Sequence, residues 1–136
     1  PQDTPTRGGG QAQYLRSGLA KGDLQRIQTK LDHAMSEEKL FRDGQLTLPL
    51  LAEHIGEKSA YISQCLNQNY NCNFFDYINR FRVQHAQELL LAYPNSSVIS
   101  ISEDVGFHSK STFYTAFKKV SGGSPGQYRQ QAQKAN

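Results

Sequence analysis

The sequence predicts an all-α fold, and three observations support it. Apolar residues along the 136-residue chain recur at steps of three or four, which places them on one face of a helix. No segment alternates apolar and polar residues between turn signals, as a half-buried strand would. The periodic segments are short and are separated by Gly, Pro and Asn, which commonly end helices.

The N-terminal part of the sequence changes character near residue 23. Residues 1–22 read as a flexible tail or truncated linker, because Gly8 to Gly10 interrupt any helix and only Tyr14, Leu15 and Leu19 have side chains suited to packing. From Asp23 one apolar stripe indicates a helix over 23–39, with a connector to residue 45: Leu24, Ile27, Leu31, Ala34 and Met35. This stripe covers either the following subdomain or a second copy of the chain.

Two helices follow over 46–73. The first runs from Leu46 to Ile55, with Thr47 as N-cap, Pro49 in the first turn and Gly56 at its end. The second covers 58–69, with Ile62, Cys65 and Leu66 facing inward. Asn71 follows, a residue type that accepts the left-handed conformation found at helix ends.

A long helix over 74–93 precedes a second pair of short helices in 94–136. Pro94 closes the long helix, and a short amphipathic helix begins near Val98 and ends at the turn residue Gly106. The next helix spans 109–120, with Phe113, Phe117 and Val120 inward, and Gly122 ends it. Ser124 and Pro125 open a last helix through Gln130.

The two pairs share one plan, an amphipathic helix of about two turns, a glycine turn and a second helix. This plan is a helix-turn-helix motif, and it occurs twice. The two subdomains cover 46–73 and 94–136, and the 74–93 linker helix joins them. Helical spacing leaves polar side chains facing outward on both second helices: Ala60, Ser63, Gln64, Asn67 and Gln68 in the first, and Lys110, Ser111, Tyr114, Thr115 and Lys118 in the second.

The side chains on these outward faces can form hydrogen bonds with the edges of DNA bases in the major groove. Gln and Asn pair bidentately with adenine, Lys reaches guanine, and Ser or Thr contacts either base or phosphate. A solvated face is the ordinary alternative, and for Tyr114 a stacking role or packing at the core's rim also competes. After Asp104 the chain has no acidic residue and five basic ones, which favours an anionic partner: Lys110, Lys118, Lys119, Arg129 and Lys134.

The chain from about Leu46 to Arg129 resembles the DNA-binding domain of the AraC/XylS family of bacterial transcriptional regulators. The more specific match is GFHSKSTFYTAFKK…GGSPGQYR, from Gly106 to Arg129. LTLPLLAEHIG, YISQCLN and FFDYINRFRVQHAQELLL agree in the first half. Three positions depart from the family pattern: Asn71 replaces a usual glycine, Ser102 a usual alanine, and Gly123 a common apolar residue.

The resemblance implies sequence-specific binding of double-stranded promoter DNA by two recognition helices in successive major grooves. Base reading would fall to Ala60, Ser63, Gln64 and Asn67 in the first and to Lys110, Ser111, Tyr114 and Thr115 in the second. Candidate phosphate contacts are Arg80, Lys118, Lys119 and Arg129. The rival hypothesis is a helical interaction module that docks an acidic partner such as the transcription machinery.

The resemblance also implies where the protein is located and which partners it has. The stretch YLRSGLAKGDLQRIQTKLDHAMSEEKLF is similar to the lead-in of family members whose DNA-binding domain follows a membrane-embedded sensory region. We therefore expect a cytoplasmic output domain of a longer regulator, and tethering of the full-length parent to the inner membrane is left as an alternative. RNA polymerase is an expected partner, as is a homodimer through the upstream region or the 23–39 helix.

Nothing in the sequence predicts an enzyme, a metal site or a cofactor. Cys65 and Cys72 lack zinc-site spacing, and no His lies in a recognisable arrangement with a nucleophile and a carboxylate. Arg82 lies among apolar neighbours in the linker helix. Its favoured interpretation is pairing with a carboxylate such as Glu53 or Asp104, with phosphate contact as the second.

Overall fold

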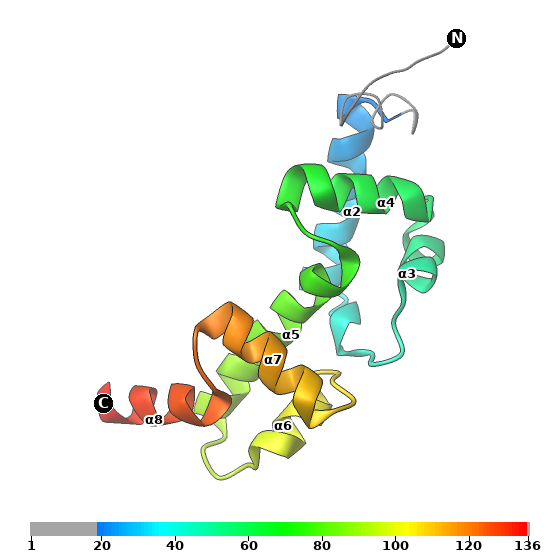
Figure 1. Ribbon diagram of the computed structural model, residues 1–136. Helices are drawn as coiled ribbons and strands as arrows, with labels where there is room; N and C mark the ends of the chain where they lie inside the picture. Colours follow the sequence, from blue (N-terminus) through cyan, green and yellow to red (C-terminus); the bar gives the residue numbers. More distant parts are fainter. Residues whose placement is uncertain (1–18, 136) are drawn as a thin grey trace. The chain divides into compact units, whose positions relative to one another are not determined.

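A computed structural model describes residues 19–135, and within this range every regular element is helical (Figure 1). Two compact units are formed. Unit 1 contains the described residues up to Glu38 together with Thr47–Phe74, and unit 2 contains Lys39–Leu46 together with the chain from Phe75 onward. Tyr14 and Leu15 lie outside the described residues, whereas Leu19 is buried. The all-α prediction is confirmed.

Unit 1 is built on α2 (Lys21–Ser36), which packs against α3 (Leu48–Ile55) and α4 (Ser59–Cys65). Figure 1 shows α4 crossing α2. Four of the five residues of the apolar stripe of α2 are buried, Ile27, Leu31, Ala34 and Met35, whereas Leu24 is half-buried. Helices α3 and α4 contribute Leu51, Ile62 and Cys65 to the same unit. The stripe predicted for this helix therefore covers the first helix-turn-helix subdomain.

The turn between α3 and α4 is held by local and tertiary contacts. Thr47 accepts a hydrogen bond from the Leu50 N–H at 3.3 Å, and Gly56 ends α3 at φ +72°. Glu57, whose side chain is only 6% exposed, accepts hydrogen bonds from Arg26 and from Lys30 of α2. These bonds lower the pKa of Glu57 to about 2, chiefly through Arg26.

The second helix of this pair ends differently from the regular helix expected over 58–69. α4 stops at Cys65 and continues as a π-helical turn, η2 (Leu66–Tyr70). Asn71 then ends it in the left-handed conformation with φ +54°, as predicted for this residue. The wider turn coincides with side-chain bonds to α2, from Asn69 to Gln28 at 2.7 Å and from Tyr70 to Asp32 at 3.1 Å.

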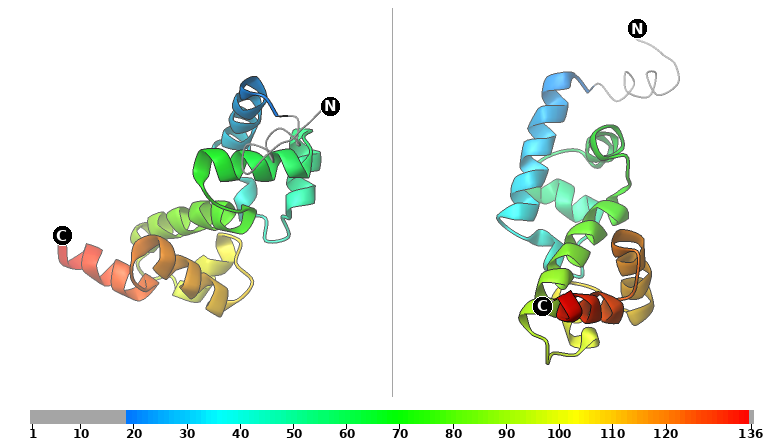
Figure 2. Two further views of the ribbon diagram at one scale, coloured as in Figure 1. Left: turned by 45° about the horizontal axis from the view of Figure 1, so that its top comes forward. Right: turned by 90° about the vertical axis from the view of Figure 1, so that its left-hand side faces the viewer.

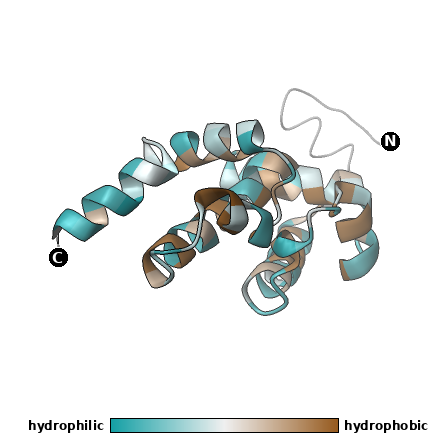
Figure 3. Ribbon diagram, turned by 90° about the horizontal axis from the view of Figure 1, so that it is seen from below, coloured by the Kyte–Doolittle hydropathy of each residue, from teal (hydrophilic) through white to brown (hydrophobic). Residues whose placement is uncertain are grey.

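Unit 2 surrounds the long helix α5 (Phe74–Ala92), with α6 (Val98–Asp104), α7 (Lys110–Ser121) and α8 (Pro125–Ala135). Its core is one cluster of buried side chains: Val83, Ala86, Leu90, Ile101, Val105, Phe107, Phe113, Ala116 and Phe117. Figure 2 shows α7 alongside α5. The final helix extends beyond the expected Gln130, and Figure 3 shows it hydrophilic along most of its length.

The connector 39–46, which includes the 3-10 turn η1 (Leu40–Arg42), belongs to unit 2 although both its sequence neighbours belong to unit 1. Phe41 is buried and stacks on Phe81 at a centroid distance of 5.9 Å. His108 contacts the Gly44 carbonyl at 2.7 Å. The connector is therefore packed against α5 and against the turn that precedes α7.

Arg82 joins the connector to α5, and the carboxylate pairing predicted for it is wrong. Its Nε donates to the Phe41 carbonyl at 2.6 Å, its Nη2 donates to the Asp43 carbonyl at 3.0 Å, and its guanidinium lies over the Phe107 ring. Gly106 permits this close approach, since a Cβ there would stand 2.9 Å from Nε and 2.8 Å from the Phe41 oxygen. Backbone carbonyls of a distant loop satisfy the charge instead of an acidic side chain.

Candidate nucleic-acid interface

The helix α7 separates a buried face from a polar face. Ser109 caps it by accepting a hydrogen bond from the Thr112 N–H at 3.1 Å, and Gly122 ends it. Phe113, Ala116 and Phe117 are buried in the core of unit 2. Three of the four predicted base readers on this helix are exposed on the other side: Lys110, Ser111 and Thr115.

Tyr114, the fourth predicted base reader on α7, is half-buried. Its ring meets Phe113 edge-on at 5.8 Å and packs against the core cluster of unit 2. The Lys110 ammonium lies 5.5 Å from the centroid of the same ring. Packing at the core's rim is therefore part of what Tyr114 does, and the ring also helps place Lys110 through a cation–π contact.

The corresponding face of unit 1 is less prominent. Ala60 and Asn67 are exposed, whereas Ser63 and Gln64 are half-buried. Ala60, Ser63 and Gln64 lie on α4, whereas Asn67 lies on the π-helical turn η2. The predicted readers of the first subdomain therefore do not share one uniform α-helical face.

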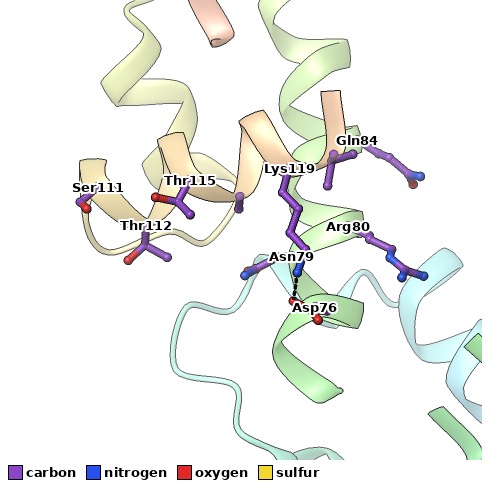
Figure 4. Close-up of a pocket in the computed structure, with 10 residues that line it drawn as sticks. Asp76, Asn79, Arg80, Gln84, Ser111, Thr112, Thr115 and Lys119 are labelled. Carbon is purple, nitrogen blue, oxygen red and sulfur yellow. Dashed lines mark hydrogen bonds and ion pairs between the residues drawn. The ribbon is translucent and has the colours of Figure 1, made fainter. Parts of the chain in front are cut away.

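A groove of about 550 Å³ runs between α5 and α7 within unit 2. Helix α5 lines it with Asp76, Asn79, Arg80 and Gln84, and α7 with Ser111, Thr112, Thr115, Ala116, Lys119 and Val120. Figure 4 shows Ser111 and Thr112 at one end of the groove and Arg80 and Gln84 at the other. The floor is partly apolar, while the polar groups are mostly hydrogen-bond donors, an arrangement suited to an anionic or polar chain.

The groove adds residues that the sequence pattern did not single out. Thr112, Asn79 and Gln84 line it beside the predicted Ser111 and Thr115. Helical spacing alone identifies which side chains share one helix face, but not which faces of two helices meet. The packing of α7 on α5, visible only in three dimensions, brings these side chains together.

The four predicted phosphate contacts have different surroundings. Lys118 and Arg80 are exposed, and neither has an ion-pair partner among the described residues. Lys119 pairs with Asp76 at 3.1 Å, which Figure 4 shows bridging the groove. Arg129 donates to the Leu90 carbonyl at 3.0 Å and to the Tyr93 carbonyl at 3.1 Å, so its guanidinium ties α8 to the end of α5.

Metal ligation or nucleophilic chemistry would depend on other titratable groups in residues 19–135. No group of three or more His, Cys, Asp or Glu side chains there could hold a metal ion. Burial raises the pKa of the Cys65 thiol, which opposes formation of a nucleophilic thiolate. Burial lowers the pKa of His85, whose ring packs edge-on against Phe41.

Comparison with known proteins gives a consistent result. Residues 51–131 match the model of a helix-turn-helix domain. The melibiose operon regulatory protein of Escherichia coli K12 is 33% identical over 91 residues, which cover 67% of this chain and 30% of that protein. The uncharacterized HTH-type transcriptional regulator YtdP of Bacillus subtilis is 29% identical over 89 residues, covering 65% of this chain and 11% of that protein.

Two solved structures share the fold. The C-terminal domain of AraT, a response regulator from Geobacillus stearothermophilus, has a TM-score of 0.66 at 30% identity and covers 78% of this chain and 84% of that one. The C-terminal domain of the two-component response regulator yesN from Fusobacterium nucleatum has a TM-score of 0.62 at 32% identity, covering 80% and 99%.

The chain thus spans 30% or less of the length of these two sequence relatives, and none of its described helices is long and apolar enough to cross a membrane. The matched region begins within α3 and includes the whole of α4, α5, α6 and α7 with the turns between them. The chain therefore belongs to the AraC/XylS-type family of DNA-binding helix-turn-helix transcriptional regulators.

Proposed function

We propose that the chain is the output domain of a longer regulator and reads duplex DNA with α7 and α4 in successive major grooves. The observation that carries the proposal is α7, whose core contacts use one face and leave Lys110, Ser111 and Thr115 exposed. Lysine contacts guanine, and hydroxyls contact bases or phosphate, so this face has the chemistry for direct readout. On α4, Gln64 is the strongest candidate for an adenine contact.

We propose that phosphate contacts flank the base readers. Lys118 and Arg80 are exposed cations without ion-pair partners in the described part of the chain, so each is available to a phosphate. The groove between α5 and α7 would hold one DNA strand, with the hydroxyls of Ser111, Thr112 and Thr115 along it. Arg129 has a weaker claim, because two backbone carbonyls already accept from it.

Selection of the chain against a random duplex library at roughly physiological salt tests the proposal. A bipartite motif with half-sites about one helical turn, ~34 Å, apart would support reading by both helices. A motif for one half alone would reduce α4 to a positioning role. Absence of any sequence enrichment and of steep salt dependence would overturn the proposal and favour the protein-interaction module.

Two lysines of α7 provide a matched pair for the base-reading claim. Lys110→Ala should weaken binding to the selected site by about 1–3 kcal/mol and relax the preference at one or two base pairs. Lys118→Ala removes the same charge from the same helix, and it should weaken binding about equally on all sequences while reducing the salt slope by about 1. Equal losses on all sequences for both variants would make Lys110 a phosphate contact.

Gln64→Ala tests the first subdomain in the same way. We expect a relaxed preference in the half-site distal to the one that Lys110 affects, at a cost of about 1–3 kcal/mol for a bidentate contact. Moving that half-site by half a helical turn should abolish the cooperation between subdomains, because the two helices would then require opposite faces of the duplex. Insensitivity to phase would show that α4 does not read DNA together with α7.

The remaining parts of the regulator follow as proposals from its length. The relatives extend far beyond the matched region, so the sensory function and any homodimer would reside in a part of the parent protein outside this sequence. RNA polymerase is the proposed protein partner at the promoter. In unit 1 most of the apolar stripe of α2 is already buried, so a dimer through that stripe is not favoured.

A further inference from the structure

A single carboxylate lies in the groove between α5 and α7. Asp76 is the only acidic residue among those that line it, where Arg80 and Lys119 supply two cations and Ser111, Thr112 and Thr115 supply three hydroxyls. The Asp76 carboxylate accepts a hydrogen bond from the Lys119 ammonium at 3.1 Å. A carboxylate at this place repels a phosphate strand and occupies one of the cations that would bind it.

The ion pair is not needed to hold α7 in place. Phe113 and Phe117 are fully buried, and Gln87 of α5 donates to the Ser121 hydroxyl at 2.7 Å near the end of α7. The side chain of Lys119 is 68% exposed, and exposed ion pairs contribute little to stability because water and salt screen them. The pair can therefore open without disturbing the packing of the helix.

We propose that Asp76 acts as an internal substitute for phosphate. On duplex DNA of arbitrary sequence, its carboxylate keeps Lys119 from binding a DNA phosphate. Lys119 remains with Asp76 while α7 is loosely placed, and it transfers to a DNA phosphate only when α7 is seated in its own site. This inference rests on the proposed function. The consequence is a protein that neutralises one phosphate fewer on random DNA than on its operator, which lowers its occupancy of the many competing sites.

The salt dependence of binding tests the proposal with the 136-residue chain, because the slope of log K against log[salt] counts neutralised phosphates at about 0.9 each. Asp76→Asn should steepen the slope on random duplex by about 0.9 and leave the slope on the selected site unchanged. Affinity for random duplex should rise roughly fivefold at ~0.1 M salt, the most that an exposed pair typically withholds. Glu88→Gln is the matched control, an exposed acid on the same helix about 18 Å further along, and it should change neither slope.

Lys119→Gln gives the crossed result. It should leave the slope on random duplex unchanged and make the slope on the selected site shallower by about 0.9. In the Lys119→Gln background, Asp76→Asn should no longer alter the slope on random duplex. An effect that persists there would mean that Asp76 acts as a general negative charge, and equal slope changes on both duplexes in either single variant would also overturn the restraint.

Failure of folding and failure of the proposed function give different results. Asp76 lies in the first turn of α5, where a carboxylate favours the helix, so far-UV circular dichroism of Asp76→Asn must match that of the wild type. An unfolded variant binds DNA more weakly, opposite to the expected gain, and Lys119→Gln then decides alone. If the wild-type chain shows no salt-dependent duplex binding, the proposed function fails; if it binds and the slopes do not separate, only the role of Asp76 fails.

Discussion

Replacing Arg82 by methionine tests whether the connector is held to α5 by the guanidinium. Methionine keeps most of the apolar stem but removes the donors to the Phe41 and Asp43 carbonyls. A hydrogen bond from a charged donor contributes about 1.5–3 kcal/mol. The Phe41 bond counts in full because that residue is buried, whereas water replaces part of the bond to exposed Asp43. We expect a loss of about 2–4 kcal/mol in the free energy of unfolding of unit 2.

Urea denaturation followed by far-UV circular dichroism measures this loss, since the chain has no tryptophan. For a denaturant slope of about 2 kcal/mol/M, the unfolding midpoint should fall by roughly 1–2 M. Arg80→Met is the matched control, because Arg80 lies two residues away on the same helix and is exposed. It should change stability by no more than about 0.5 kcal/mol.

The two variants should differ in DNA affinity in the opposite way: Arg80→Met should lose affinity, and Arg82→Met should keep it. Arg80→Met should weaken binding on all duplexes, because a phosphate contact carries no sequence information. Arg82→Met should bind nearly normally at low temperature, where unit 2 remains folded. Identical urea midpoints for the two variants would refute the structural role of Arg82, and identical losses of DNA affinity without unfolding would make both residues phosphate contacts.

Three further outcomes follow from the packing. Ser109→Ala removes the cap of α7 and should cost about 1 kcal/mol of stability, measured by urea denaturation against Ser100→Ala, an exposed serine that caps nothing. Phe113→Ala empties a fully buried ring site and should cost about 3–5 kcal/mol by the same measurement, losing the core of unit 2. The folded pKa of Glu57, about 2, lies below the usual 4.5, so its stabilising contribution is present above pH 4.5 and is lost as pH falls towards 2. In Glu57→Gln, the free energy of unfolding should therefore depend less on pH across that range. If the variant had the same pH dependence as the wild type, the contacts of Glu57 with Arg26 and Lys30 would be contradicted.

The local parts of the fold were predictable from the sequence because they depend on residues within one helical turn of one another. Thr47 caps α3 and Gly56 ends it, both as predicted, whereas Ser109, predicted as the first residue of its helix, is the N-cap of α7. Even the departure from the family pattern at Asn71 was interpretable, since asparagine accepts the left-handed conformation that the end of η2 requires. Helix bounds agree to within about three residues, except at α4, which gives way to a π-helical turn after Cys65, and at the final helix, which runs on to Ala135.

The tertiary contacts were not predictable, because they join residues far apart in sequence. Arg82 has its partners 39 and 41 residues away, in backbone carbonyls that no side-chain pattern records. The π-helical turn at Leu66–Tyr70 breaks a periodicity that looks regular in the sequence, and its polar side chains bond to α2. The groove beside α7 depends in the same way on which face of α5 it meets.

Helix α7, the proposed recognition helix, has its core contacts on one face and its exposed polar side chains on the other, and this separation explains why the fold is easier to infer than a DNA site. Phe113, Ala116 and Phe117 fix α7 in the core, whereas exposed Thr115 and Ser111 can change with little effect on stability. Tyr114 is the exception, because its half-buried ring packs on Phe113. If α7 reads bases as proposed, we expect substitutions at positions 111 and 115 to alter base preference with little loss of stability. A substitution at position 114 should also lower stability, because that side chain packs on the core.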